Sequence, residues 1–196
     1  MPNVSPLGRA ELAEFEPLFQ MIEAQMGFVP NSLFLMGRRP EILRAFAMVV
    51  GSVLGPGAVD PGLKQLVAHI ASTASGCRYC QAHTASNAGR LGVSGEKIAT
   101  AWEFERSPLF TDAERAALRL ARDAAVVPNA TTPAHFDDLR PHFDEDAIIE
   151  IVAVIALFGW LNRWNDTLAT SLEDEPLGFA AAHLGRRGWS PGKHAC

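Results

Sequence analysis

The sequence predicts an all-α protein, and three observations carry that prediction. Apolar residues recur along most of the chain with the three-to-four-residue spacing of amphipathic helices. Residues that favour helix starts stand before several of these segments, as in the capping-box pattern of Thr111 and Glu114. No segment alternates convincingly between apolar and polar residues as a half-buried strand does. We therefore expect more than half of the residues to be helical and no sheet.

The first part of the chain contains three expected helical segments. Apolar spacing over residues 10–26 predicts an amphipathic helix, which ends at a Gly-Phe-Val-Pro break. Asn31 or Ser32 can cap a short turn after that break. Pro40 then begins a further helix, which ends at the Gly-Pro-Gly of residues 55–57.

The later expected helices each begin at a capping residue or after a glycine. Asp60 is an N-cap followed by Pro61, a residue favoured in the first helical turn. Acidic side chains at 144–146 suit the positive end of the longest expected helix. The expected spans are 61–75, 77–89, 94–102, 111–126, a short helix from 132, and 144–170.

Length and composition indicate one soluble globular domain. The chain has 196 residues, 48% of them hydrophobic, with a net charge of −5 and no basic run, which argues against a nucleic-acid partner. No apolar run reaches the roughly 20 residues of a membrane span. The first residues lack a secretory pattern, so a cytoplasmic location is the expectation. We expect one helical domain over residues 1–185, and a loosely held tail over 186–196 that ends in a free Cys196 without a role.

A faint internal repeat accompanies these helices. Residues 65–71 (QLVAHIA) align with 150–156 (EIVAVIA), and without a gap Cys77 and Cys80 then fall on Asn162 and Asn165. The pattern predicts a degenerate two-helix unit used twice, although chance similarity between two apolar helices remains an alternative. In a true repeat, the second copy has lost its thiols and serves as scaffold.

The segment Cys77-Arg78-Tyr79-Cys80-Gln81-Ala82-His83 is the strongest candidate site. A thiolate is a nucleophile, and a second thiol nearby can resolve its oxidised form into a disulfide. On a helix, Cys77, Cys80, His83 and Thr84 share one face. Gly76 interrupts the preceding apolar pattern, so the pair should lie where a new helix begins, and a helix N-terminus lowers a thiol pKa.

Three other interpretations of the pair stay open. Cys77, Cys80 and His83 could be zinc ligands, but the second close ligand pair of ordinary zinc sites is absent. Both thiols could be inert core residues, although the flanking polar side chains argue against that. A structural disulfide would close a very short loop and gain little entropy. A redox pair without a metal or cofactor is the interpretation that chemistry favours.

The chain resembles the carboxymuconolactone decarboxylase superfamily, and within it the alkylhydroperoxidase D–like, peroxidase-related branch. Residues 63–69 (LKQLVAH) and 75–83 (SGCRYCQAH) carry the resemblance, and 26–31 and 39–43 resemble the lead-in of that branch. The resemblance implies the alkylhydroperoxidase D–like all-α fold, homo-oligomers, and thiol peroxidase activity. It assigns attack on peroxide to Cys80 and resolution to Cys77.

Two site residues depart from the pattern of that branch. The position of its glutamate, read twelve residues before Cys77, is Gln65, whose amide cannot take a proton. Its histidine position is Thr84, and the imidazole stands one residue earlier, at His83. His69 lies one turn beyond Gln65 and could replace the lost base, or it could be a polar residue at a packed interface.

The predicted function is reduction of hydroperoxides, organic ones above all, through the Cys77–Cys80 pair, with a dithiol as the recycling reductant. The alternative is a redox-responsive scaffold or binding protein of the same fold that does not turn over. The apolar helices around residues 42–53 and 148–164 predict a homo-oligomer that covers part of their surface.

Overall fold

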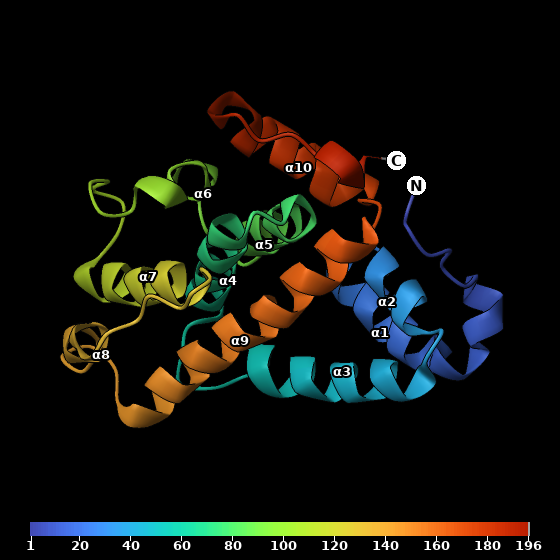
Figure 1. Cartoon of the computed structure of the whole chain (residues 1–196), viewed down its shortest axis with the longest axis horizontal. Helices are drawn as coiled ribbons and strands as arrows, with labels where there is room; N and C mark the ends of the chain where they lie inside the picture. Colours follow the sequence, from blue (N-terminus) through green and yellow to red (C-terminus); the bar gives the residue numbers. More distant parts are fainter. Residues whose placement is uncertain (196) are drawn as a thin grey trace.

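The computed structural model describes residues 1–195, in which about 70% of residues are helical and no strand occurs (Figure 1). This confirms the predicted all-α class. The α-helices of this range are α1 (Glu16–Met26), α2 (Asn31–Met36), α3 (Pro40–Leu54), α4 (Pro61–Ser75), α5 (Arg78–Arg90), α6 (Gly95–Ala99), α7 (Asp112–Ala124), α8 (Pro133–Leu139), α9 (Glu145–Leu168) and α10 (Asp174–Leu184). Short 3₁₀-helices are η1 (Arg9–Phe15), η2 (Ala101–Glu103), η3 (Gly185–Arg187) and η4 (Gly192–His194).

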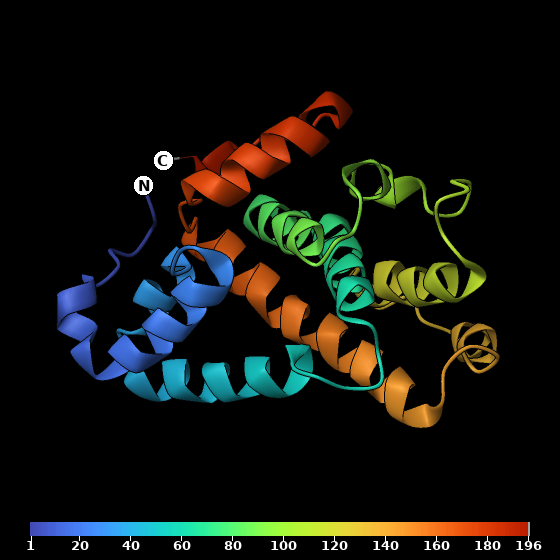
Figure 2. The ribbon, with the colours of Figure 1, turned by 180° about the vertical axis from the view of Figure 1, so that it is seen from behind.

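Helices α4 and α5 form the centre of the molecule. Helix α4 packs against α5, α7 and α9, and α5 also packs against α10. Viewed from behind, α4 and α5 lie between α10, α7 and the long diagonal α9 (Figure 2). Eleven consecutive residues of α4, from Gly62 to Ser72, are buried, which is unusual for a helix of a small soluble protein. The main hydrophobic core therefore surrounds α4 and includes both thiols.

The chain turns sharply between α4 and α5. Gly76 ends α4 in the left-handed conformation, with φ of 80°, which glycine adopts without the strain of a side chain. Cys77 is extended and caps α5, accepting a hydrogen bond from the backbone N–H of Cys80. The expected helix break before the first thiol is confirmed.

The N-terminal segment has a smaller core of its own. Phe15, Phe19, Leu33, Met36 and Leu43 are buried there, together with neighbouring apolar residues. The expected helix over 10–26 begins instead as 3₁₀-helix η1, and α1 follows after Phe15. A proline in the first turn of α1 fixes this restart, because it lacks the N–H that a continuing helix needs.

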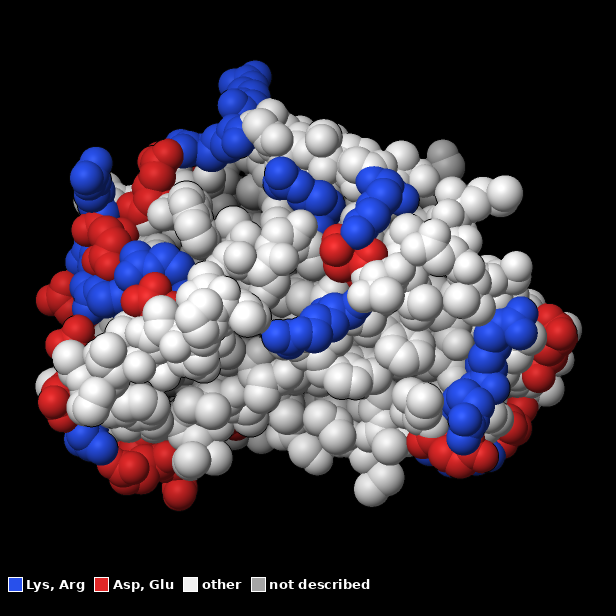
Figure 3. All heavy atoms as spheres, viewed as in Figure 1, with Lys and Arg blue, Asp and Glu red and all other residues white. Residues whose placement is uncertain are grey.

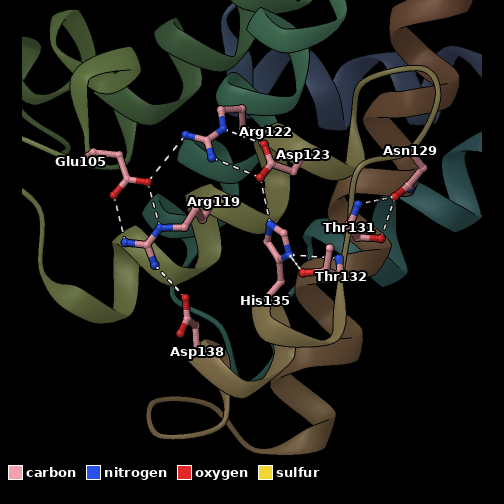
Figure 4. Close-up of polar contacts among 9 residues, drawn as sticks. All are labelled: Glu105, Arg119, Arg122, Asp123, Asn129, Thr131, Thr132, His135 and Asp138. Atoms are coloured by element: carbon pink, nitrogen blue, oxygen red, sulfur yellow. Dashed lines mark hydrogen bonds and ion pairs between the residues drawn. The ribbon is translucent and has the colours of Figure 1, made fainter.

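Polar contacts hold α7 to the start of α8 (Figure 4). Arg119 on α7 bridges Glu105 and Asp138, and Asp123 accepts hydrogen bonds from Arg122 and from Nε2 of His135 at 2.9 Å. These contacts join α7 to α8 and to the segment before α7, and none of them involves a thiol. They organise the periphery and supply no group to the cysteine pair.

The segment after α10 corrects one prediction. The glycine, proline and basic residues at 186–196 predicted a loose tail, but Trp189 and His194 are buried and η4 packs against α5. The backbone carbonyl of His194 accepts a hydrogen bond of 2.9 Å from the N–H of Leu172, and Lys193 forms an ion pair with Asp166. Two buried anchors thus outweigh an otherwise flexible composition. The predicted role-free thiol Cys196 lies outside the described residues.

Helix α9 is the long second partner of the centre. Its most apolar 18-residue stretch has a mean hydropathy of 1.6, enough by length and composition alone to cross a membrane, but 44% of that stretch is buried in the protein. It packs against α3, α4, α5 and α7 as a core helix does. Asp144 caps its start, as predicted, and Ala169 ends it in the left-handed conformation.

Candidate functional site

The two thiols lie side by side at the start of α5 and are both free. Sγ of Cys77 is 3.4 Å from the backbone N of Cys80, which donates to it. Cys77 is fully buried and Cys80 nearly so. The arrangement places one sulfur at the positive end of a helix and the other one turn inside it.

The two thiols differ in their readiness to ionise. The hydrogen bond from the Cys80 thiol lowers the pKa of Cys77 most, burial opposes this, and His194 and the Cys80 N–H add to the lowering, which brings the pKa to about 6. Burial, with the charge that develops on Cys77, raises the pKa of Cys80 well above its ordinary value. The resting thiolate therefore belongs to Cys77, whereas the family resemblance assigns the attack to Cys80.

His194 and Asp166 complete a cluster around the first thiol. Sγ of Cys77, a carboxylate oxygen of Asp166 and a ring nitrogen of His194 all lie within 4.8 Å of one another. Three such groups are one fewer than the four ligands of a structural zinc site. The cluster fits acid–base chemistry at Cys77 better than a closed metal site, and the sequence pattern gave no sign of it.

His69 occupies the position next to Thr84. Its Nδ1 lies 3.0 Å from Oγ1 of Thr84 and 3.2 Å from the carbonyl of Gln81, which fixes the proton on Nδ1 because a carbonyl only accepts. Burial lowers the pKa of His69 to about 4, so the ring is neutral near pH 7. The hydroxyl of Thr84 in turn donates a hydrogen bond of 2.7 Å to the backbone carbonyl of Cys80.

Gln65 is buried one turn before His69. Its Oε1 has no hydrogen-bond partner among residues 1–195. An amide with one oxygen unpaired in the core marks the place where the resemblance expects a proton-binding glutamate. His69 is connected to the cysteine helix through Thr84. Within residues 1–195, Oε1 of Gln65 makes no such connection to either thiol.

His83 points to a carboxylate. Its Nε2 is 2.7 Å from Oε2 of Glu173, and Oε1 of the same carboxylate accepts a hydrogen bond of 2.9 Å from the hydroxyl of Tyr79. Burial would raise the pKa of Glu173, but the charge and hydrogen bond of His83 outweigh it and the pKa is lowered. The rings of Tyr79 and His83 stack with centroids 4.2 Å apart. His83 thus shares the helix start with the thiols but is engaged with Glu173.

Helix α9 carries two buried asparagines, of which Asn165 contacts the pair. Nδ2 of Asn165 donates to Sγ of Cys80 at 3.6 Å. Both side-chain polar atoms of Asn162 are buried without a partner in residues 1–195. Asn165 is therefore a further site residue that the motif alone did not single out, although the internal alignment had matched it to Cys80.

A hollow of about 730 Å³ opens beside His83. Phe28, Asn31, Arg90 and Glu173 are among its lining residues, and the Phe28 ring contacts that of His83 with centroids 5.6 Å apart. A second hollow of about 870 Å³ runs along the outer side of α9, where Trp160 and Trp164 contribute to an apolar wall. Two contacts of His83, Phe28 and Glu173, thus line the first hollow, and His83 lies one helical turn from Cys80.

Comparison with known proteins places these features in context. Residues 40–123, which include both thiols and all of α4 and α5, match the carboxymuconolactone decarboxylase family. YnjA of Escherichia coli (strain K12), a protein of uncharacterised function, is 31% identical over 167 residues, which are 85% of this chain and 91% of YnjA.

Two solved structures are similar to this chain over most of its length. The debrominase Bmp8 in complex with 2,3,4-tribromopyrrole, with one cysteine replaced by alanine, superposes with a TM-score of 0.86 at 35% identity, over 92% of this chain and 96% of that one. An uncharacterised peroxidase-related protein of Ralstonia eutropha JMP134, described as an alkylhydroperoxidase AhpD core, gives 0.82 at 23% identity, over 94% and 96%. The second likeness bears on the fold alone.

Proposed function

Since the chain belongs to the carboxymuconolactone decarboxylase family, we propose that it is a thiol-dependent oxidoreductase whose Cys77–Cys80 pair delivers two electrons to a substrate. The observation that carries the proposal is the pair itself. Two free thiols stand at a helix start, the backbone N–H of Cys80 donates to Sγ of Cys77, and the pKa of Cys77 is lowered to about 6. A thiolate formed near neutral pH is what thiol redox chemistry requires.

The first candidate substrate is a hydroperoxide. One sulfur attacks an oxygen of R–OOH, the O–O bond breaks, and the products are an alcohol and a sulfenic acid. The other thiol displaces water from the sulfenic acid, and a Cys77–Cys80 disulfide remains. A dithiol reductant then exchanges with the disulfide and restores both thiols. The apolar surroundings of the core favour an organic hydroperoxide over hydrogen peroxide.

The second candidate is reductive removal of bromine from an aromatic ring. The likeness to the debrominase Bmp8 over nearly the whole chain favours it. The same pair can supply the electrons, because an aryl bromide and two thiols convert to the unsubstituted ring, a disulfide and hydrogen bromide. Both candidates thus end in the same oxidised protein.

One experiment separates the candidates. Reduced protein is mixed in separate samples with cumene hydroperoxide and with 2,3,4-tribromopyrrole, and the thiols are counted over time. Trypsin cleaves after Arg78 and so places Cys77 and Cys80 on different peptides, which a disulfide joins in the mass spectrum. We expect one mole of disulfide per mole of substrate reduced, with catalytic turnover when dithiothreitol is added.

Single substitutions serve as the controls. Cys77→Ser and Cys80→Ser should each abolish disulfide formation, and His142→Asn, at an exposed position, should leave it unchanged. A joined peptide without turnover in excess dithiol supports the alternative of a redox-responsive scaffold. If neither substrate oxidises the pair, the oxidoreductase proposal is wrong.

We also propose that the chain forms a homo-oligomer. Met48 is 75% exposed and Ile149 is 68% exposed, and Trp160 lies nearby on the outer side of α9, stacked on Phe46 with ring centroids 5.2 Å apart. In the view of Figure 3, charged side chains are dense towards the two ends of the molecule and the region over α3 is largely uncharged, although a basic side chain crosses the middle of this face. An apolar face of this kind suits contact with a second copy. Light scattering at micromolar concentration tests it, and a monomer would contradict it.

A further inference from the structure

The segment after α10 brings an imidazole to the first thiol. His194 is fully buried, and its Nδ1 lies 2.8 Å from the carbonyl oxygen of Thr170. Because that oxygen only accepts, Nδ1 carries the proton and the neutral ring presents a lone pair on Nε2. Nε2 is the nitrogen 3.5 Å from Oδ1 of Asp166 and is without a conventional hydrogen bond in residues 1–195.

The neighbour of His194 Nε2 that can react is the thiol of Cys77. The cluster of Cys77, Asp166 and His194 spans no more than 4.8 Å between donor atoms. The Thr170 carbonyl holds one edge of the ring, so the other edge is aimed at the carboxylate and at Sγ of Cys77. A base, its orienting partner and a nucleophile within reach of one another are what an activated thiol needs.

The second thiol has no comparable base. The glutamate position is the amide Gln65, the histidine position is Thr84, and His83 is engaged with Glu173. Apart from its hydrogen bond with Cys77, Cys80 Sγ accepts one from the Asn165 amide, which donates and cannot take a proton. The groups that could ionise a thiol are thus gathered at Cys77.

We propose that His194 is the catalytic base of this site, that Asp166 positions it, and that Cys77 rather than Cys80 is the attacking thiol. This assignment rests on the proposed oxidoreductase function and reverses the order implied by the family resemblance. The lowered pKa of Cys77 and the raised pKa of His194 agree with it; burial alone would lower the latter, and Cys77, Thr170 and Asp166 outweigh burial.

The steps balance with the residues in place. The proton of the Cys77 thiol moves to Nε2 of His194, which leaves a thiolate beside an imidazolium. The thiolate attacks an oxygen of R–OOH, a S–O bond forms and the O–O bond breaks, and the departing alkoxide takes the proton from His194. Cys80 then attacks the sulfenic sulfur; its own proton leaves with the hydroxide as water, and the disulfide forms.

Other titratable groups face this cluster and must be counted. The Cys80 thiol shares a hydrogen bond with Cys77. Lys193 pairs with Oδ2 of Asp166 at 2.7 Å, and the Tyr79 ring lies 6.0 Å from that of His194. Burial and Glu173 raise the pKa of Tyr79 well above its ordinary value, so it stays neutral across the range of the test. Between pH 5 and 8, His194 is accordingly the group whose removal should act on Cys77.

The test measures the thiols directly and needs no substrate. Reduced protein, dialysed against a chelator, is treated briefly with iodoacetamide at a series of pH values. Trypsin then separates Cys77 from Cys80, and mass spectrometry gives the alkylation rate of each. We expect the rate at Cys77 to rise with a midpoint near pH 6, in line with its pKa, and to exceed the rate at Cys80 at pH 7.

His194→Asn is the decisive variant, because its amide can still donate to Thr170 while the nitrogen that faces Cys77 is gone. We expect the midpoint at Cys77 to rise by about one pH unit or more, which lowers the rate at pH 6 about fivefold or more. Asp166→Asn should move the midpoint in the same direction by less, because the base remains. His142→Asn is the matched control and should leave the profile unchanged.

Folding and function are kept apart in this design. Circular dichroism melts show whether His194→Asn is folded, and if it is not, Asp166→Asn and His194→Gln carry the comparison. An unchanged Cys77 profile in folded variants, or faster alkylation of Cys80 in the wild type, would overturn the assignment. Either result leaves the oxidoreductase proposal standing, since disulfide formation by substrate tests that separately.

Discussion

The α4–α5 corner and the straight helix α9 are the two halves of the internal alignment, and they handle the same positions differently. Gly76 ends α4 and Cys77 caps α5, whereas α9 continues through the aligned Leu161 and Asn162 without a break. The break frees the N–H of Cys80 from the helical ladder, and it donates to Cys77 instead. In a straight helix that N–H bonds to a carbonyl.

The comparison shows what turns a packed helix into a reactive one. One left-handed glycine exposes a helix N-terminus inside the core, and a thiol placed there meets both a backbone donor and the positive end of the helix. The same position in α9 carries Asn162, whose polar atoms find no partner within residues 1–195. The chemistry of the first half thus depends on the corner as much as on the cysteines.

The largest expected effect concerns the ion pair that joins the first turns of α4 and α9. Lys64 of α4, 1% exposed, forms an ion pair of 2.9 Å with Glu150 of α9 and donates to two backbone carbonyls. Lys64→Met leaves both carbonyls unpaired and the carboxylate without its cation, with only backbone N–H donors such as that of Val59 remaining, so we expect a loss of about 3–5 kcal/mol in unfolding free energy by urea titration.

The matched control for this pair is Arg140→Met, which breaks exposed ion pairs and should change stability by less than about 0.5 kcal/mol. Adding Glu150→Gln to Lys64→Met should restore part of the loss, because the buried charge is gone. A Lys64→Met protein as stable as the wild type would mean that α4 and α9 do not depend on this contact.

A second prediction concerns the pH dependence of stability that His69 introduces, since the aligned residue of α9, Val154, does not titrate. Burial lowers the pKa of His69 to about 4, while an unfolded histidine titrates near 6.5. The unfolded chain therefore binds the extra proton first, and stability falls as the pH drops from about 6.5 towards 4, by up to about 3 kcal/mol.

His69→Asn should remove this share of the acid sensitivity while keeping a donor for Gln81 and Thr84. Unfolding free energies at pH 7 and pH 4.5 give the difference for each protein. His142→Asn, which is exposed, should retain the full loss on acidification. Equal pH dependence in the wild type and His69→Asn would show that His69 is not held neutral.

Local signals in the sequence predicted the helices and the corner well. The cap at Asp60, the capping box at Thr111 and the break at Gly76 all depend on neighbours within one turn, which a sequence displays directly. The close placement of Cys77 and Cys80 at a helix start followed from the same reasoning.

The partners of the site were not predictable in that way. Glu173 and His194 contact the cysteine segment although they lie about ninety residues or more further along the chain. No spacing rule connects them to the motif. Tail composition pointed to disorder because glycine and proline carry no periodic signal, and the buried Trp189 and His194 anchor it through tertiary packing alone. The direction of His83 was likewise decided by Glu173, not by its distance from Cys80 along the chain.

A third prediction tests the corner itself. Gly76→Ala puts a side chain on a left-handed residue, and since the added Cβ would meet no atom within 4 Å, the cost is backbone strain of about 1 kcal/mol. Gly159→Ala in the straight helix should instead stabilise by about 0.5–1 kcal/mol, because its Cβ has room and alanine favours the helix. Opposite signs in urea titrations support the comparison, and a destabilised Gly159→Ala would contradict it.

The smallest expected effects distinguish Asn162 from Asn165, the counterparts of the two cysteines. Leucine is close to asparagine in shape but has no polar atoms. Asn162→Leu removes two unpaired buried groups, so we expect stability to rise by about 0.5–1 kcal/mol. Asn165→Leu removes the donor to Cys80 Sγ, which helps to hold down the pKa of that thiol against burial and Cys77. The alkylation rate of Cys80 at pH 9 should therefore fall in Asn165→Leu and stay unchanged in Asn162→Leu. If both variants slow Cys80 equally, the two asparagines act through packing and the specific contact at Asn165 has no bearing on the thiol.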